Sequence, residues 1–185
     1  LKDYENAAKY YIPAAEQGSA KAKVDLGWMY EHGHGVTKDV QIALDLYQKA
    51  ANEGLSAAQY NLGIIYKDGV IVPKDLVKSK EYFEKAAEQG HARATAQVGH
   101  CYFYGKGCEI DYAEAFEWYM RAAQKENDAQ CNLAWMYERG KGVEKDMAKA
   151  VEWYEKAAEN GSVGAMRNLG ILYRDGEKWA YELTT

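Results

Sequence analysis

The chain has 185 residues, of which 48% are hydrophobic and 28% charged, and it contains two prolines. With a mean hydropathy of -0.57, this composition excludes a disordered chain and is typical of a soluble, ordered protein. The formal net charge of -5 excludes the basic surface that nucleic-acid binding requires. The sequence also lacks the run of about 18 apolar residues that crosses a bilayer.

The sequence repeats itself at an interval of 36 residues. The interval shortens to 35 between Tyr102 and Tyr137, which places a one-residue deletion near residues 125–128. A fixed period of this size predicts stacked units, each of which contacts only its neighbours. The recurring positions include Gly27, Gly63 and Gly99, then Tyr30, Tyr66 and Tyr102, then Asp39, Asp75 and Asp111.

The first elements in chain order are predicted to be helices. Residues 1–18 match the second half of the repeat, so we expect a second helix without its first, and Pro13 should bend or fray its last turn. In the repeat 19–54, apolar residues at intervals of three and four predict an amphipathic helix over residues 20–31. Asp39 then accepts hydrogen bonds from the first amides of a second helix, which ends at Gly54.

The same helix pair recurs in the repeats 55–90, 91–125 and 126–161. Residues 162–176 form the first helix of an incomplete repeat, and residues 177–185 depart from the pattern. The sequence therefore predicts ten helices in an all-α fold. Because the chain starts at Leu1 in mid-repeat, we expect a fragment of a longer array. A signal peptide would lie outside it, which leaves the cytoplasm and the bacterial envelope or secretion open as compartments.

Glycines recur inside the predicted first helices, where each costs about 1 kcal/mol relative to alanine. We expect close approach of the two antiparallel backbones to offset this cost, because small residues recur on the second helices. Larger aromatic residues should fill the space between units. The small residues are Ala43, Ser79, Ala115 and Ala150, and the aromatic ones are Tyr47, Phe83, Tyr119 and Tyr154.

The segment from Leu26 to Tyr30, followed by Gly33, Gly35 and the pair Ala50–Ala51, resembles the Sel1-like repeat. The resemblance implies a right-handed α-solenoid of antiparallel helix pairs, related to tetratricopeptide repeats, whose first helices line a concave groove. Members of this family, many of them bacterial, serve as adaptors that gather proteins into complexes. A subgroup is stapled by one disulfide in each repeat. This chain lacks the cysteine pattern of that subgroup. It has three cysteines, which cannot all pair within one chain.

By analogy with tetratricopeptide grooves, variable positions of the first helices are predicted to bind another protein or a peptide segment. Mixed aromatic and charged side chains suit such a surface, because aromatic and Arg anchors carry much of the affinity of interfaces. The predicted partner-binding residues are Lys21, Asp25, Trp28, Glu31, Tyr60, Asn61, Lys67, Gln97, His100, Phe103, Asn132, Trp135, Glu138 and Arg139.

Two positions of the repeat, each called a slot because it is filled once in every repeat, have a second interpretation. The slot of Trp28 and Trp135 is apolar in most repeats, which favours core packing. A second slot is polar in every unit. Its side chains would form hydrogen bonds either with the backbone of a partner or between helices of this chain. Its residues are Asp25, Asn61, Gln97, Asn132 and Asn168.

No sequence motif indicates catalysis, a metal or a cofactor. His32 and His34 are two imidazoles without a third ligand nearby, so we expect no metal site. The prediction is a non-enzymatic interaction scaffold. The alternatives are an envelope or secreted protein that recognises cell-wall fragments or has a weak hydrolase-associated role, and end-to-end self-association in place of a monomer.

Overall fold

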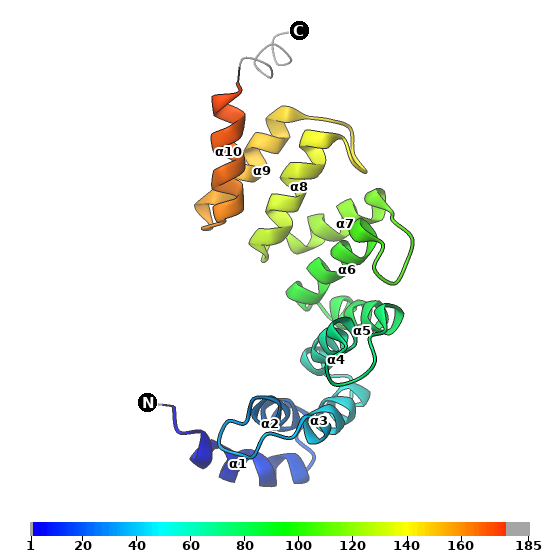
Figure 1. The fold of residues 1–185 in the computed structure, drawn as a ribbon, viewed down its shortest axis with the longest axis vertical. Helices are drawn as coiled ribbons and strands as arrows, with labels where there is room; N and C mark the ends of the chain where they lie inside the picture. The colour runs from blue at the N-terminus through cyan, green and yellow to red at the C-terminus, as the bar shows by residue number, and fades with distance from the viewer. Residues whose placement is uncertain (1, 177–185) are drawn as a thin grey trace. The chain divides into compact units, whose positions relative to one another are not determined.

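The computed structural model describes residues 2–176, and every regular element in that range is an α-helix (Figure 1). The predicted ten helices and the all-α fold are confirmed for these residues. The tail predicted over residues 177–185 lies outside them. The helices are α1 (Tyr4–Glu16), α2 (Ala20–His32), α3 (Val40–Asn52), α4 (Ser56–Asp68), α5 (Leu76–Glu88), α6 (Ala92–Tyr104), α7 (Tyr112–Ala122), α8 (Asn127–Arg139), α9 (Met147–Glu159) and α10 (Val163–Arg174).

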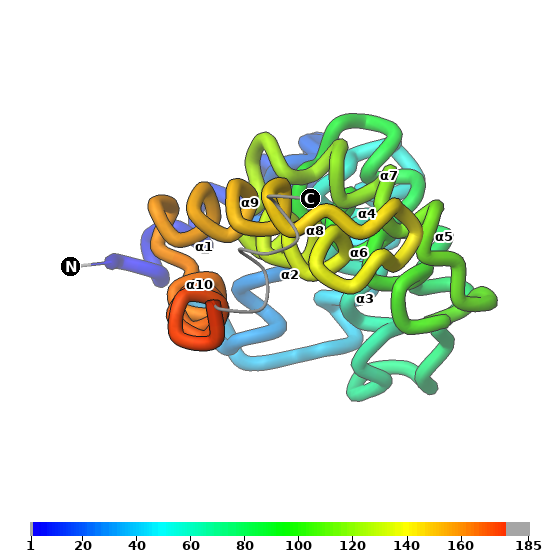
Figure 2. Tube along the Cα trace, turned by 90° about the horizontal axis from the view of Figure 1, so that it is seen from above, coloured from blue at the N-terminus to red at the C-terminus, as the bar shows by residue number. Residues whose placement is uncertain are grey.

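Contacts divide the chain into two compact units, residues 1–94 and residues 95–185. In the first unit each helix from α1 to α5 packs against the next one in the sequence. In the second unit α7 packs on α8, α8 on α9, and α9 on α10, which Figure 2 shows nearly end-on beside α9. Contact between consecutive helices is what a stack of short repeats requires, because no single repeat can bury its apolar face alone.

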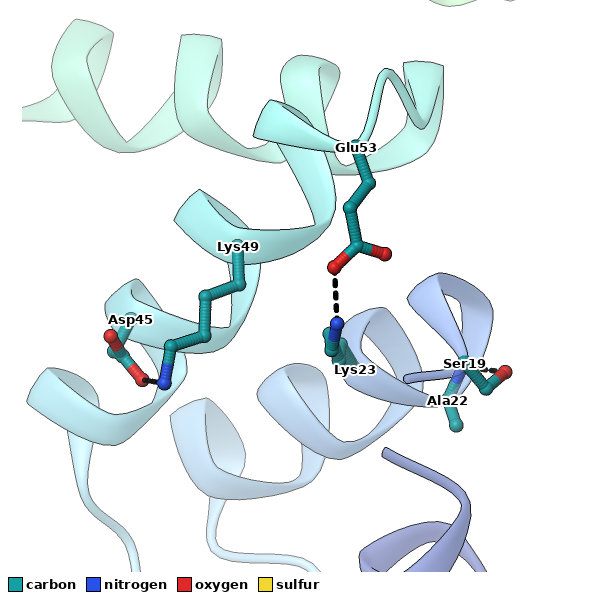
Figure 3. Close-up of polar contacts among 6 residues, drawn as sticks. All are labelled: Ser19, Ala22, Lys23, Asp45, Lys49 and Glu53. Atoms are coloured by element: carbon teal, nitrogen blue, oxygen red, sulfur yellow. Dashed lines mark hydrogen bonds and ion pairs between the residues drawn. The ribbon is translucent and has the colours of Figure 1, made fainter. Parts of the chain in front are cut away.

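Hydrogen bonds local in sequence set the helix ends. The Asp39 carboxylate accepts from the amides of Gln41 and Ile42, both at 3.0 Å, and so begins α3. Ser19 begins α2 in the same way, with its Oγ 3.3 Å from the Ala22 amide (Figure 3). α2 ends at Gly33, whose φ of 72° is one that L side chains rarely adopt. These caps confirm the ends predicted for this repeat.

The expected fraying at Pro13 does not occur. α1 continues to Glu16, and the Pro13 carbonyl still accepts from the Gln17 amide at 3.0 Å. Ala15, in the same turn, is 7% exposed and belongs to an apolar cluster with Ala22 and Leu26 of α2. Proline removes its own amide but not its carbonyl, so burial of the last turn holds the helix together.

Aromatic rings, rather than backbone, lie closest to Gly27, Gly63 and Gly99 of the first helices, which corrects our expectation. A Cβ added at Gly63 would stand 2.5 Å from Cε1 of Phe83, and one at Gly27 would stand 2.8 Å from Cε1 of Tyr47. The small residue on the second helix also contacts the first helix, since Ser79 Oγ donates to the Gly63 carbonyl at 2.8 Å. Glycine is therefore needed so that a ring of the second helix can lie on the first helix.

One polar contact joins the first helix of a repeat to the end of its second helix. In the repeat 19–54 it is the ion pair between Lys23 and Glu53 (Figure 3). Glutamine and asparagine make the equivalent contact in two other repeats. These pairs are Gln89 with Gln59 at 2.7 Å and Asn160 with Gln130 at 3.1 Å. An ion pair near the surface contributes about 0–1 kcal/mol, so apolar packing supplies most of the stability.

Candidate functional site

In the first unit, the predicted face of α2 and α4 contains a pocket of about 330 Å³. Glu31 and His32 come from the last turn of α2, and Ile64 and Asp68 come from α4. The volume is at the lower end of the range for ligand sites, and the pocket combines an aliphatic lining with charged groups. The remaining lining residues are Lys38, Val40, Ile65, Val70 and Ile71.

Ile71 explains why this pocket lies at this repeat. The equivalent residues in two other repeats are Gly35 and Gly142, with φ of 69° and 72°. A Cβ at Gly35 would lie 2.2 Å from the Tyr4 carbonyl oxygen, so that loop rests on the start of the preceding second helix. Isoleucine cannot make this approach, and none of the non-glycine residues among 2–176 has a positive φ. Space remains beside Ile71 and the 87% exposed Val70.

Sequence reasoning missed Val70 and Ile71. The available signal was a departure from the repeat, because aliphatic residues stand here where the other loops have histidine, lysine or glycine. The predicted partner-binding residues all lie on helices and therefore do not include these loop residues.

The exposed end of α2 is an aromatic stack. Trp28 is 38% exposed, and its ring centroid lies 4.8 Å from that of His32 and 4.8 Å from that of His34. His34 in turn stacks on Tyr4 at 4.6 Å. Both imidazoles therefore pack against aromatic rings. Within residues 2–176, no cluster of three or more metal-ligating side chains occurs.

In the second unit, the predicted residues of α6 and α8 meet across neighbouring repeats. Asn132 Nδ2 lies 3.2 Å from His100 Nε2, and the rings of Phe103 and Trp135 make an edge contact with centroids 5.3 Å apart. Tyr104, at the end of α6, is 55% exposed. The structure thus joins polar and aromatic positions that are more than 30 residues apart in the sequence.

Two predicted groove residues have an internal role. Glu31 accepts a hydrogen bond from the hydroxyl of Tyr47 at 2.8 Å, and Glu138 accepts one from Tyr154 at 2.9 Å. Both tyrosine rings are fully buried. Burial first, and then the neighbouring carboxylate, raises the pKa of Tyr47 and of Tyr154.

The polar slot is partly occupied by contacts within the chain. Asn132 lies within hydrogen-bond distance of His100, and Asn168 forms a hydrogen bond with the side chain of Tyr154. Asn61 and Gln97 are half-buried, whereas Asp25 is exposed. Of the two interpretations of this slot, hydrogen bonding between helices thus holds at Asn132 and Asn168.

The remaining predicted residues are spread over both units. Lys21 is exposed on α2, and Tyr60 stacks on His91 with ring centroids 4.7 Å apart. Lys67 Nζ lies 3.8 Å from Asp68 Oδ1, and Arg139 Nε lies 3.2 Å from Glu138 Oε1.

Two of the three cysteines are in contact with each other. Cys108 Sγ donates to the Cys101 carbonyl at 3.5 Å, and burial raises the pKa of the Cys131 thiol. Across residues 2–176, none of the helices has the length and apolar character needed to cross a membrane.

The Sel1 repeat family matches the chain six times, over residues 1–19, 20–55, 56–91, 92–127, 127–162 and 163–181. The chain belongs to the Sel1 repeat family. Two crystal structures resemble it with a TM-score of 0.89 and 37% identity. One is a protective antigen of uropathogenic Escherichia coli with an SLR fold, covering 91% of this chain and 36% of the antigen. The other is a Sel1 repeat protein from Oxalobacter formigenes, covering 95% of this chain and 72% of that protein.

Among curated proteins, mouse protein sel-1 homolog 2 is 50% identical over 42 residues, which is 22% of this chain and 6% of the mouse protein. The chain thus spans only a small part of this curated relative. Sel1 repeat solenoids generally mediate protein–protein interaction and are typically non-catalytic. The family therefore accounts for the repeated helix pair, whereas a specific partner must be argued from the faces of this chain.

Proposed function

We propose that this Sel1 repeat chain is a non-enzymatic scaffold that binds a segment of another protein on the faces of its first helices. The pocket between α2 and α4 carries the proposal. It is open, it combines aliphatic side chains with Glu31 and Asp68, and its lining includes one predicted partner-binding residue, Glu31. An apolar side chain of a partner would enter the pocket while polar groups of its backbone contact the rim, as in other helical grooves.

Two valines of the first unit provide a matched test. Val70 lines the pocket and is 87% exposed, whereas Val77 lies on α5, outside the pocket lining, and is 56% exposed. Because both side chains are exposed, replacing either with glutamate leaves the core intact. Partners are captured from extracts of the source cells on the wild-type chain and on each variant, and are quantified by mass spectrometry.

We expect Val70→Glu to abolish capture of the main partner and Val77→Glu to leave it unchanged. Loss of the partner with Val77→Glu, together with full capture by Val70→Glu, would assign binding to the second helices and contradict the proposal.

A further inference from the structure

Tyr119 has a buried hydroxyl without a hydrogen-bond partner. Its side chain is 0% exposed, and its Oη atom has no acceptor or donor in reach among the described residues. Burial raises the pKa of Tyr119, so the hydroxyl keeps its proton and stays a donor. A buried hydroxyl left unpaired has lost its hydrogen bonds to water without a replacement, which destabilises the chain. Such a group therefore needs an explanation, and one explanation is an acceptor that arrives with a ligand.

The other repeats show which acceptor is missing. Tyr47 and Tyr154, at the equivalent position, donate to the carboxylates of Glu31 and Glu138. In the repeat 91–125 the glutamate is replaced by Phe103 while the tyrosine remains. The repeat 55–90 has lost both groups, because it has Lys67 and Phe83 at these positions. Among the four complete repeats over residues 19–161, only the one with Tyr119 keeps the donor without the carboxylate.

The surroundings of Tyr119 favour an anion. Residues 95–108 contain no aspartate or glutamate, although the chain as a whole carries a net charge of -5. Lys106 Nζ lies 5.0 Å from the centroid of the Tyr104 ring, and Lys141 Nζ lies 5.1 Å from that of Tyr112. Both rings contact Phe103, with centroids 4.7 Å and 5.3 Å away. An acidic group over Phe103 would therefore lie beside two rings that each contact a lysine, and α6 itself carries no aspartate or glutamate.

We propose that this face of α6 binds an acidic segment of a partner protein, and that an Asp or Glu carboxylate of that segment accepts the hydrogen bond of Tyr119. The inference rests on the proposed scaffold function and adds the chemistry of the partner. Because the hydroxyl is covered, a neighbouring ring must turn aside on binding. Tyr104 is the ring with room to do so, since it adjoins Phe103 and is 55% exposed.

The test uses a phage-displayed library of random 12-residue peptides as the probe, selected on the immobilised full chain. A parallel selection uses Phe103→Glu, which places a carboxylate of the chain beside Tyr119. We expect the wild-type chain to select peptides with one recurrent acidic residue, and Phe103→Glu to lose this preference. The selected peptide and its Glu→Gln or Asp→Asn version are then titrated by fluorescence anisotropy into the wild-type chain and into Tyr119→Phe.

We expect the amide peptide to bind the wild-type chain about 10-fold to 100-fold more weakly, as for loss of a charged hydrogen bond. With Tyr119→Phe the difference in affinity between the two peptides should become smaller, because only the attraction of the carboxylate to the lysines remains. Tyr119→Phe removes only an unpaired atom, so it remains folded and tests the inference even if Phe103→Glu unfolds. Equal affinity of one peptide for the wild-type chain and Tyr119→Phe would overturn the inference and leave the scaffold function standing. Selection of no peptide would contradict both.

Discussion

Removing the hydroxyl from each buried tyrosine should change the stability in opposite directions. Tyr47 and Tyr154 donate to glutamate at 2.8 Å and 2.9 Å, whereas Tyr119 has no partner within the described residues. Phenylalanine keeps the ring and its packing, so each Tyr→Phe change reports on one oxygen atom. The repeat 55–90 already has Phe83 at this position, fully packed at 1% exposure.

The magnitudes follow from the partners. A hydrogen bond to a charged group contributes about 1.5–3 kcal/mol. Water replaces part of it here, because Glu31 is only half-buried. We therefore expect Tyr47→Phe and Tyr154→Phe each to lower the free energy of unfolding by about 1 kcal/mol. Tyr119→Phe removes an unpaired buried hydroxyl and should raise it by about 1 kcal/mol. For a chain of this size, 1 kcal/mol corresponds to about 2–4 °C in Tm.

Urea unfolding followed by circular dichroism measures the free energy of unfolding of the three variants and the wild-type chain. A loss of stability in Tyr119→Phe as large as that in Tyr47→Phe would refute the reasoning, because it would mean that the Tyr119 hydroxyl has an acceptor such as a buried water.

Gly63→Ala should lower the free energy of unfolding by about 1–3 kcal/mol, because its Cβ would meet the Phe83 ring at 2.5 Å. Gly170→Ala is the control, since nothing lies within 4 Å of that Cβ, and urea unfolding should show a gain of up to about 1 kcal/mol. Asp39→Ala should cost about 1 kcal/mol in the same assay, because it removes the N-cap of α3. Above pH 10 the tyrosines of the unfolded chain lose their protons, whereas Tyr47 of the folded chain keeps its proton because its pKa is raised. Stability should therefore fall as pH rises, and Tyr47→Phe should reduce that slope by about 1.4 kcal/mol per pH unit in urea titrations.

Much of the fold was predictable because its signals are local in the sequence. An N-cap such as Asp39 bonds amides two and three residues away, and a glycine such as Gly33 ends a helix through its own φ. The period carries these signals from one repeat to the next, so one repeat read correctly predicts the others. The reason for the interior glycines was predicted wrongly, since the side-chain pattern does not show whether backbone or the Tyr47 ring lies against Gly27.

The candidate site was predictable only as a set of helix faces. The sequence by itself determined the repeat, the helix ends and the positions open to variation, since these follow from backbone geometry and apolar spacing. Only the tertiary structure decided that Glu31 pairs with Tyr47, that Ile71 leaves a pocket, and that Phe103 leaves Tyr119 without an acceptor. Each of these depends on side chains of different elements meeting at atomic distance. Such contacts change with a single substitution that leaves the repeat pattern intact.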